Sequence, residues 1–310
     1  MKRLLFIDHE MHRATQSARF FVDLLRKDFD VTELAYARYY RTGAAAAMRG
    51  QDAAVVWEFP IARGRFFFLG KVNVFVPMYD NEWGSVWQWR RLAASGTGVV
   101  SFCGKVSAHA RRCGVRNLLD VRYFPDPAAL PPAAGDPKKV FLWERGGLSR
   151  AQAEVLFPAS DGYELVVKGA DEFLPRAAYL ARLASCGVVV APRRKEGIGM
   201  AFLEALAMGK CVVAHDDATM NEYIEGGASG LLVDFDRPAR LSPARVAAAR
   251  AGVVAAAARH RARWMRDAAR IAPFIAGLAP CRPSLGARLK IALEYPFYLA
   301  EGAWRRLRHG

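Results

Sequence analysis

Two glutamates and two glycines lie close together in a stretch that reads RRKEGIGMAFLEALAMGK. Glu196 and Glu204 flank seven residues, and Gly197 and Gly199 precede a run of helix-forming residues from Met200 to Met208. The first amides of a helix attract negative charge, and glycine lets a ligand approach the backbone closely. An ionised carboxylate accepts hydrogen bonds only, so each glutamate can bind sugar hydroxyl groups. The pattern therefore predicts a pocket for a nucleotide sugar, with its phosphates at the start of the helix.

The residues on either side of this stretch indicate how the pocket is positioned. An apolar run, residues 187–191, has the length of a buried strand, and Pro192 ends it. Gly209 stands where a helix stop is expected, and residues 211–214 form the next apolar run. The sequence thus predicts one strand–loop–helix–strand unit of a parallel sheet.

Residues 187–234 resemble the donor-site signature of the group 1 retaining glycosyltransferases of the GT-B fold, a family-four-like pattern. The similarity extends to Asn221–Ile224 and Gly230–Val233. It implies that Glu196 contacts the donor sugar as a catalytic residue and that Glu204 contacts the ribose. It also implies metal-independent hexosyl transfer with retention, without a cofactor. The donor would be a nucleotide-diphosphate sugar and the acceptor a saccharide or a lipid-linked group, in cell-surface polysaccharide or glycolipid assembly.

A cation for the donor diphosphate is predicted at Arg145, which follows the strand that begins at Val140. In the resembling family an arginine at this strand end and a later lysine bind the diphosphate. A guanidinium can bind phosphate oxygens in a bidentate manner. Two residues are candidates for the second cation, Arg150 and Lys168. The predicted donor-binding residues are Arg145, Arg150, Lys168, Gly197, Ile198, Gly199, Met200 and Glu204.

The acceptor side is less clearly marked. Many members of the resembling family carry a histidine in the region that corresponds to residues 77–83, and this chain has none there. We expect Asp80 to take the catalytic role, with His109 as the alternative. Five aromatic residues are candidates for stacking on an acceptor sugar, although half or more are expected in the core. They are Trp57, Phe59, Trp83, Trp87 and Trp89.

Two metal-like patterns do not fit a metal site. The segment Asp8-His9-Glu10-Met11-His12 has one residue between its glutamate and second histidine, whereas the zinc-protease pattern has two on a helix. Residues 8–17 are instead predicted to form a polar loop. Asp-x-Asp occurs at residues 28–30 and 234–236, in neither case at the end of a predicted strand. No metal site is predicted.

Short apolar runs alternate with helical stretches along the chain, which favours two Rossmann-like, doubly wound parallel-sheet domains facing a cleft. Further strands are predicted at residues 4–7, 31–34, 52–57, 72–76, 99–103 and 165–167, and helices from residue 20, at 174–184 and at 242–275. The predicted domains are an acceptor-side domain (1–124), a Pro-rich linker (125–139), a nucleotide-sugar-binding domain (140–275) and a basic tail (276–310). The tail is expected to return to the first domain or to reach a membrane surface.

Charge and cysteine content suggest where the protein works. The net charge is +15, and from Arg237 onward 15 lysines and arginines face only 3 acidic residues. Residues 285–310 mix apolar and basic side chains and are too polar to span a bilayer, so we expect them to lie on an anionic membrane. The start of the chain does not read as a signal peptide, no apolar run is long enough to span a bilayer, and five scattered cysteines suggest reduced thiols. These features predict a cytoplasmic protein, peripheral on the inner face of the membrane.

Two other functions share some of these features. A glycoside hydrolase or phosphorylase would also use paired carboxylates such as Glu196 and Glu204. A non-catalytic nucleic-acid-binding protein would share the basic charge, but the sequence contains no nucleic-acid motif, so no nucleic-acid partner is expected.

Overall fold

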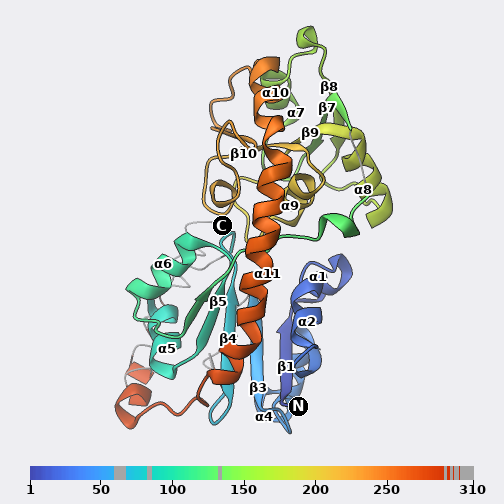
Figure 1. Cartoon of the computed structure of the whole chain (residues 1–310). Helices are drawn as coiled ribbons and strands as arrows, with labels where there is room; N and C mark the ends of the chain where they lie inside the picture. The colour runs from blue at the N-terminus through green and yellow to red at the C-terminus, as the bar shows by residue number, and fades with distance from the viewer. Residues whose placement is uncertain are drawn as a thin grey trace. The chain divides into compact units, whose positions relative to one another are not determined.

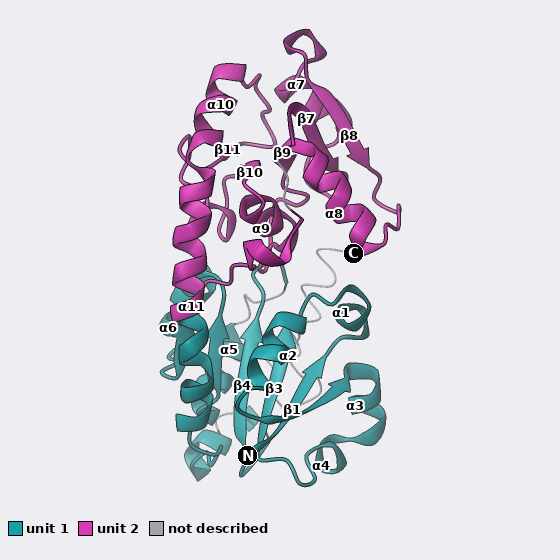
Figure 2. Ribbon diagram, turned by 45° about the vertical axis from the view of Figure 1, so that its right-hand side comes forward, with its two compact units in different colours: residues 1–121, 267–310 teal, residues 122–266 magenta. Residues whose placement is uncertain are grey.

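The computed structural model describes residues 1–58, 68–81, 86–131, 135–289, 292–293, 296 and 300. The chain divides into two compact units, shown in different colours in Figure 2. Unit 1 comprises Met1–Val121 and Asp267–Gly310, and unit 2 comprises Arg122–Arg266. Each unit contains one parallel sheet, which confirms the predicted pair of Rossmann-like folds.

The sheet of unit 1 has six strands in the order β2-β1-β3-β4-β5-β6. The strands are β1 (Arg3–Asp8), β2 (Asp30–Ala35), β3 (Ala53–Glu58), β4 (Val72–Pro77), β5 (Gly98–Ser101) and β6 (Leu118–Asp120). All neighbours run parallel; Leu4, for example, pairs with Val31 on one side and Ala53 on the other. The central strands are apolar and buried almost throughout, as expected for a parallel sheet covered on both faces.

Helices connect these strands (Figure 1). They are α1 (Glu10–Thr15), α2 (Arg19–Leu25), α3 (Tyr36–Thr42), α4 (Ala44–Ala47), α5 (Val86–Ser95) and α6 (Gly104–Arg112). Helix α3 packs on β1 and β2, and α6 packs on β5 and β6. The polar loop predicted for residues 8–17 contains α1 instead, because the side chain of His9 accepts a hydrogen bond from the amide of Met11 and caps the helix start.

An aromatic cluster fills the core of unit 1. The ring of Trp57 lies 5.1 Å from that of Phe21 and 5.8 Å from that of Phe6, measured between centroids. Phe102 completes the cluster at 6.0 Å from Trp57. Because aromatic side chains bury large apolar areas, these contacts stabilise the sheet directly beneath its carboxyl edge.

The structure corrects two of the aromatic residues proposed to stack on an acceptor. Trp57 and Trp89 are 2% and 0% exposed, so both belong to the core. Trp87 is half-buried and has the guanidinium of Arg90 above its ring at 5.3 Å. Phe59 and Trp83 lie outside the described residues.

The chain leaves unit 2 and re-enters unit 1 within one helix, α11 (Val253–Gly277). Beyond it, Cys281 exchanges two backbone hydrogen bonds with the segment before β4: its carbonyl accepts from the amide of Gly70, and its amide donates to Lys71 O, both at 2.8 Å. The segment that follows α11 is therefore hydrogen-bonded to unit 1.

Unit 2 contains a five-stranded sheet in the order β11-β10-β9-β7-β8. The strands are β7 (Asp136–Trp143), β8 (Glu164–Lys168), β9 (Cys186–Val190), β10 (Cys211–His215) and β11 (Leu231–Val233). Besides α11, its helices are α7 (Arg150–Leu156), α8 (Arg176–Ser185), α9 (Met200–Ala207) and α10 (Pro243–Ala251), with short 3-10 turns η1 (Pro127–Ala129), η2 (Ala159–Asp161) and η3 (Met220–Glu222). Helices α8 and α9 pack on β9 (Figure 1).

The core of unit 2 alternates along the strands. Val140 and Leu142 of β7 point into one cluster together with Val188 and Val190 of β9, and all four are fully buried. Phe157, which ends α7, closes the cluster. Phe141 and Val189, which lie between the four strand residues and point to the other face, are buried too, so the short apolar runs form strands covered on both faces.

Several predicted boundaries differ from the observed ones. The predicted linker, residues 125–139, overlaps β7, which starts at Asp136 and pairs with β8 from Lys139 onward. The predicted helical stretch 242–275 is divided at Gly252 into α10 and α11, and residues from Asp267 onward group with unit 1. Strands β6 and β11 were not predicted, because each has only three residues.

Close backbone packing between β7 and β9 yields a stability prediction. A Cβ atom on Gly187 would lie 2.6 Å from the carbonyl oxygen of Asp136 and 2.7 Å from Cα of Pro137, and backbone atoms cannot move aside as a side chain can. Gly187→Ala should therefore lower the free energy of unfolding by about 1–3 kcal/mol, the usual cost of overpacking. Urea denaturation followed by circular dichroism measures this change.

Gly226→Ala is the matched control, since a Cβ atom there meets nothing within 4 Å. The two variants should differ clearly in their denaturation midpoints. Equal midpoints would show that β7 and β9 do not pack as closely as described.

Candidate functional site

A left-handed turn at Gly199 leads from the loop after β9 into helix α9. Gly199 has φ +79°, and a Cβ atom there would lie 1.9 Å from Cε1 of Phe202. Only glycine fits this position without displacing the phenyl ring. The N-cap residue of α9 is thus a glycine, without a side chain of its own to cap the helix, and the first amides of a helix are groups that can bind an anion. Of the predicted donor residues in the loop, Gly197 and Ile198 are buried and Met200 is half-buried.

Glu204, on the second turn of α9, is a buried carboxylate with a single cationic partner. It is 2% exposed, and its Oε1 accepts a hydrogen bond from Nη2 of Arg176 at 2.7 Å. Burial raises the pKa of Glu204, and the guanidinium of Arg176 acts against this rise. Arg176 is the first residue of α8, and sequence reasoning missed it. The one available signal was its place just after Pro175, where a helix begins.

Two cations share one aromatic ring at the carboxyl end of β7. The guanidinium of Arg145 lies 4.9 Å from the ring centroid of Trp143, and Nζ of Lys168 lies 4.1 Å from it. Lys168 is buried and donates to the carbonyl oxygen of Glu172 at 2.6 Å. Burial lowers the pKa of Lys168, and Arg145 lowers it further. Lys168 is therefore the cation that the fold brings to Arg145.

Arg150, the other candidate for the second cation, is placed differently. Its Nε donates to Oε1 of Glu154 at 3.0 Å, and its side chain is 67% exposed along the outer face of α7. Its backbone amide donates to Oε1 of Glu144 at 2.9 Å. The backbone amide of Arg150 thus bonds the start of α7 to Glu144, and its side chain forms an ion pair with Glu154 on the surface.

Tyr179 of α8 links the cations to the glutamates. Its ring lies 5.9 Å from that of Trp143. Burial raises the pKa of Tyr179, as do the charges of Glu204 and Glu196, while Arg176 and Arg145 lower it. All four charged groups therefore lie within electrostatic range of one phenol.

Two polar atoms of this region lack a described partner. Among the described residues, the buried hydroxyl of Tyr179 has no hydrogen-bond partner, and the buried Nε1 of Trp143 has no acceptor for its proton. A buried polar group without a partner costs about 1–3 kcal/mol.

A second set of charged residues lies at the carboxyl edge of the sheet in unit 1. His12 of α1 lies between two carboxylates: its Nδ1 is 2.6 Å from Oδ1 of Asp8, and its Nε2 is 2.7 Å from Oε2 of Glu58. Asn81 donates from Nδ2 to the other oxygen of Glu58 at 3.1 Å. Asp80, which the sequence singled out, is exposed and adjoins Asn81 in the loop after β4. We refer to Asp8, His12 and Glu58 as the His12 cluster.

Sequence reasoning missed the His12 cluster as a unit. It treated Asp8 and His12 as part of a failed metal motif, and among the described residues no group of three or more His, Cys, Asp or Glu is arranged to hold a metal. Glu58 is far away in the sequence, and its place at the end of a strand was its only signal. The alternative catalytic residue, His109, stacks edge-on against the buried ring of Trp89 at 5.9 Å and contacts Cys113.

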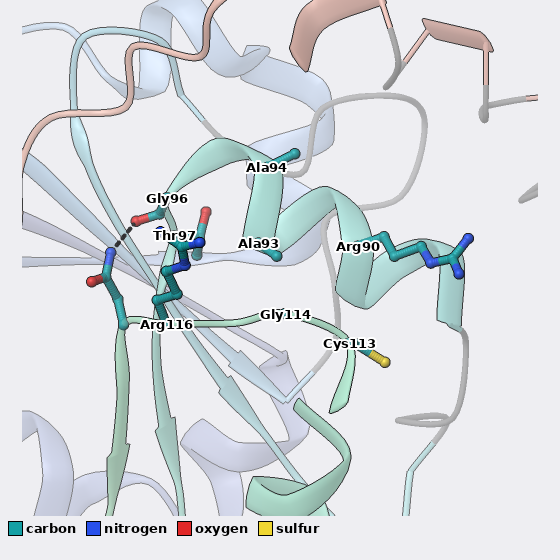
Figure 3. Close-up of a pocket in the computed structure, with 9 residues that line it drawn as sticks. Arg90, Ala93, Ala94, Gly96, Thr97, Cys113, Gly114 and Arg116 are labelled. Atoms are coloured by element: carbon teal, nitrogen blue, oxygen red, sulfur yellow. Dashed lines mark hydrogen bonds between the residues drawn. The ribbon is translucent and has the colours of Figure 1, made fainter. Parts of the chain in front are cut away.

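Figure 3 shows a pocket elsewhere in unit 1. It is lined by residues of α5 and by the segments that precede β5 and β6, among them Arg90, Thr97, Cys113 and Arg116. These segments lie at the amino ends of the strands, whereas the His12 cluster lies at their carboxyl ends. Figure 3 also shows Arg90 directed away from Arg116, so the two guanidinium groups do not converge. The pocket contains none of the predicted site residues.

Comparison with known families and structures agrees with this fold. Residues 164–249 match the family described as Glycosyl transferases group 1, a region that includes β8, α9 and both glutamates. A search of curated proteins found no significant match. The matched part is less than half of the chain, so the comparison shows a similarity of this part of unit 2 to that family.

Solved structures with similar folds cover nearly the whole chain. One is Anabaena Alr3699/HepE in complex with UDP and glucose, with a TM-score of 0.58 and 14% identity over 90% of this chain and 100% of that one. A glycosyltransferase from Rickettsia africae ESF-5 has a TM-score of 0.59 and 11% identity over 89% and 99%. Sucrose-phosphate synthase from Thermosynechococcus elongatus has a TM-score of 0.51 and 12% identity over 97% and 100%. These similarities confirm the predicted GT-B fold class.

The His12 cluster generates a prediction about stability and pH. Burial lowers the pKa of His12, but hydrogen bonds with Asp8 and Glu58 outweigh it and raise the pKa from 6.5 to about 9. Between these values the unfolded chain releases a proton that the folded chain retains. The free energy of unfolding should therefore fall as pH rises from 6.5 to about 9, and His12→Gln should lose this dependence.

Urea denaturation of both proteins across this pH range measures the effect. His9→Gln is the matched control, because it alters the same helix start and leaves the cluster intact; it should retain the parental slope. A His12→Gln variant with the parental pH dependence would contradict the ion pairs of His12.

Proposed function

We propose that the protein is a glycosyltransferase of the GT-B fold that transfers a sugar from a nucleotide-diphosphate donor to a saccharide or lipid-linked acceptor. Unit 2 would hold the donor. The observation that carries the proposal is the arrangement around Tyr179: its ring packs against Trp143, which bears Arg145 and Lys168, and Arg176 of the same helix pairs with Glu204. A site that combines carboxylates with fixed cations suits a ligand that combines hydroxyl groups with phosphates.

Each part of the donor would meet a matching group. The glycine-capped start of α9 and the cations around Trp143 would bind the diphosphate, with Arg145 contacting it and Lys168 alongside. Glu204 would accept hydrogen bonds from the ribose hydroxyls, and Glu196, 8% exposed in the loop before α9, from the donor sugar. Arg176 would move from Glu204 toward the diphosphate when the ribose arrives.

The chemistry follows from this placement. An acceptor hydroxyl forms a bond to the anomeric carbon while the bond between that carbon and the diphosphate oxygen breaks. Negative charge develops on the departing diphosphate, where fixed cations and helix amides stabilise it best. The hydroxyl proton passes to the departing phosphate, so no protein nucleophile is required. We propose this route, with retention at the anomeric carbon and without a metal or cofactor; Asp80, at the carboxyl edge of unit 1, would assist on the acceptor side.

The burial of Glu204 favours this proposal over glycoside hydrolysis. A hydrolase needs two carboxyl groups that both reach the scissile bond. Glu204 is 2% exposed and bonded to Arg176, so it suits a binding role on one side of the ligand.

The test of the proposed function is binding of nucleoside diphosphates. Isothermal titration calorimetry with UDP, GDP, ADP and dTDP should detect binding of at least one of them. Glu204→Ala should weaken that binding by about 1.5–3 kcal/mol, the range for hydrogen bonds to a charged group. Glu154→Ala removes an exposed, ion-paired glutamate from the same unit and should leave the affinity unchanged.

Two outcomes would contradict the proposal. Failure of all four nucleotides to bind would contradict the proposal that unit 2 holds the donor. Loss of sugar transfer in EDTA, with recovery on adding manganese, would contradict the metal-independent part.

The C-terminal region supports a further part of the proposal, the location of the acceptor at a membrane. Residues 285–289 are helical after Ser284, whose side chain accepts from the amide of Ala287. Leu285, Leu289 and Leu293 recur at intervals of four and are 84%, 60% and 65% exposed. Residues 301–310, including the predicted membrane contacts Trp304, Arg305, Arg306 and Arg308, lie outside the described residues. The described helices include none that is long and apolar enough to cross a membrane.

We therefore propose that the region rests on an anionic lipid surface at the cytoplasmic face, with the leucines toward the acyl chains. Co-sedimentation with vesicles of phosphatidylglycerol and phosphatidylcholine tests this. Replacing Leu285, Leu289 and Leu293 together by serine should reduce the bound fraction, and high salt should reduce it for the parent. Equal sedimentation of the two proteins, or no binding at low salt, would contradict the membrane proposal.

A further inference from the structure

The His12 cluster lies at a special point of the sheet in unit 1. From β1 the chain winds to β2 on one side and then crosses to β3 on the other. In open α/β sheets, ligands bind outside the carboxyl ends of the strands at such a reversal of strand order. Asp8 is the last residue of β1 and Glu58 the last residue of β3. The two carboxylates therefore flank the reversal, and His12 bridges them.

His12 holds the two carboxylates in place. Each ring nitrogen faces a carboxylate oxygen at 2.6–2.7 Å, so the imidazole donates on both sides and carries both protons. With both nitrogens protonated, the ring has no lone pair with which to accept a proton from a substrate. It is a positioning residue, and its positive charge leaves the cluster with one net negative charge.

The backbone at Glu58 is strained. Its φ of +64° lies in the left-handed region, which residues other than glycine adopt only with steric strain. Glycine would adopt this φ without strain. The strained backbone aims the carboxylate at His12 and Asn81, both of which bond to it.

The cluster is largely buried but has acceptor capacity to spare. The side chains of Asp8, His12 and Glu58 are 6%, 11% and 15% exposed, so Glu58 is the most open of the three. Oδ1 of Asp8 accepts from the amide of His9 and from His12, while among contacts between described residues Oδ2 of Asp8 accepts none. Each carboxylate oxygen offers about two lone pairs, so both carboxylates can accept further hydrogen bonds.

We propose that Asp8 and Glu58 bind hydroxyl groups of the acceptor sugar, with His12 as the residue that positions them. That this sugar is the acceptor rests on the proposed function, whereas the binding of a sugar at this edge of the sheet is independent of it. Carboxylates accept hydrogen bonds only, so their ligand must donate, and a sugar presents several hydroxyl donors. The net negative charge of the cluster disfavours phosphate, in contrast to the cations around Trp143 in unit 2. The two units would thus separate the two substrates by charge.

The experiment uses the whole protein without nucleotide. Saturation-transfer NMR with the methyl glycosides of glucose, galactose, mannose and N-acetylglucosamine should detect binding of at least one of them. Glu58→Gln should weaken that binding by about ten- to a hundredfold, the loss of a hydrogen bond to a charged group. Glu33→Gln is the matched control, because Glu33 is an ion-paired carboxylate of the same sheet, on β2, and its loss should not affect binding.

The role of His12 has its own readout. His12→Gln should weaken glycoside binding, and His12→Lys, which restores a positive charge between the carboxylates, should recover part of it. A purely structural role would give the two variants the same affinity. Glu58→Gly tests the carboxylate without the strain: it should fold at least as stably as Glu58→Gln, and it should bind the glycoside no better.

Three results would overturn the inference: no glycoside bound by the parent, parental affinity in Glu58→Gln, or equal weakening in Glu33→Gln. Nucleoside diphosphate binding, measured separately by calorimetry, should be unchanged in every variant of the cluster. If the parent fails to bind nucleotide but binds a glycoside through Glu58, the proposed function fails and the sugar site in unit 1 stands.

Discussion

All strand neighbours in both sheets run parallel, and this constraint shapes the whole molecule. A parallel pair needs a crossover, so every strand delivers its carboxyl end to the same edge of its sheet. Residues that are distant in the sequence meet there without any direct selection of their spacing. Asp8 and Glu58 meet at one such edge, and in unit 2 Arg145, Lys168 and the start of α9 follow three different strands. The chemistry of each unit is thus collected at one edge by topology.

The two edges solve opposite electrostatic problems. In unit 2 a carboxylate is buried, and removing Glu204 from water is tolerated because the guanidinium of Arg176 stands against it. In unit 1 a cation is enclosed, and His12 remains charged because a carboxylate faces each ring nitrogen. In each unit, the ion pairs within the group of charged residues leave a net charge. This net charge is positive around Trp143 and negative around His12.

The sequence predicted those features that depend on short apolar runs. The runs around Leu4, Val140 and Val188 became central strands because they are buried on both faces. The start of α9 was predicted because two glycines precede a run of helix-forming residues, and the structure places Gly199 at the N-cap with φ +79°. The three-residue strands were missed, since a run that short carries no period. Glu204 pairs with Arg176, and His12 with Glu58, because the order of the strands brings separate elements together. No local sequence pattern predicts that order. The proximity of Lys168 to Arg145 likewise depends on the ring of Trp143, which both cations contact.

Unit 1 is discontinuous in the sequence, since its second part, residues 267–310, follows the whole of unit 2. Protein synthesis proceeds from the amino end, and domains generally fold as units as they emerge. All residues of unit 2 therefore leave the ribosome before Cys281, which forms hydrogen bonds with Gly70 and Lys71. Until Cys281 emerges, Gly70 and Lys71, which precede the central strand β4, lack these two hydrogen bonds. In a nascent chain, this part of unit 1 therefore stays exposed until unit 2 has been synthesised. During that time it is a surface that a chaperone could bind.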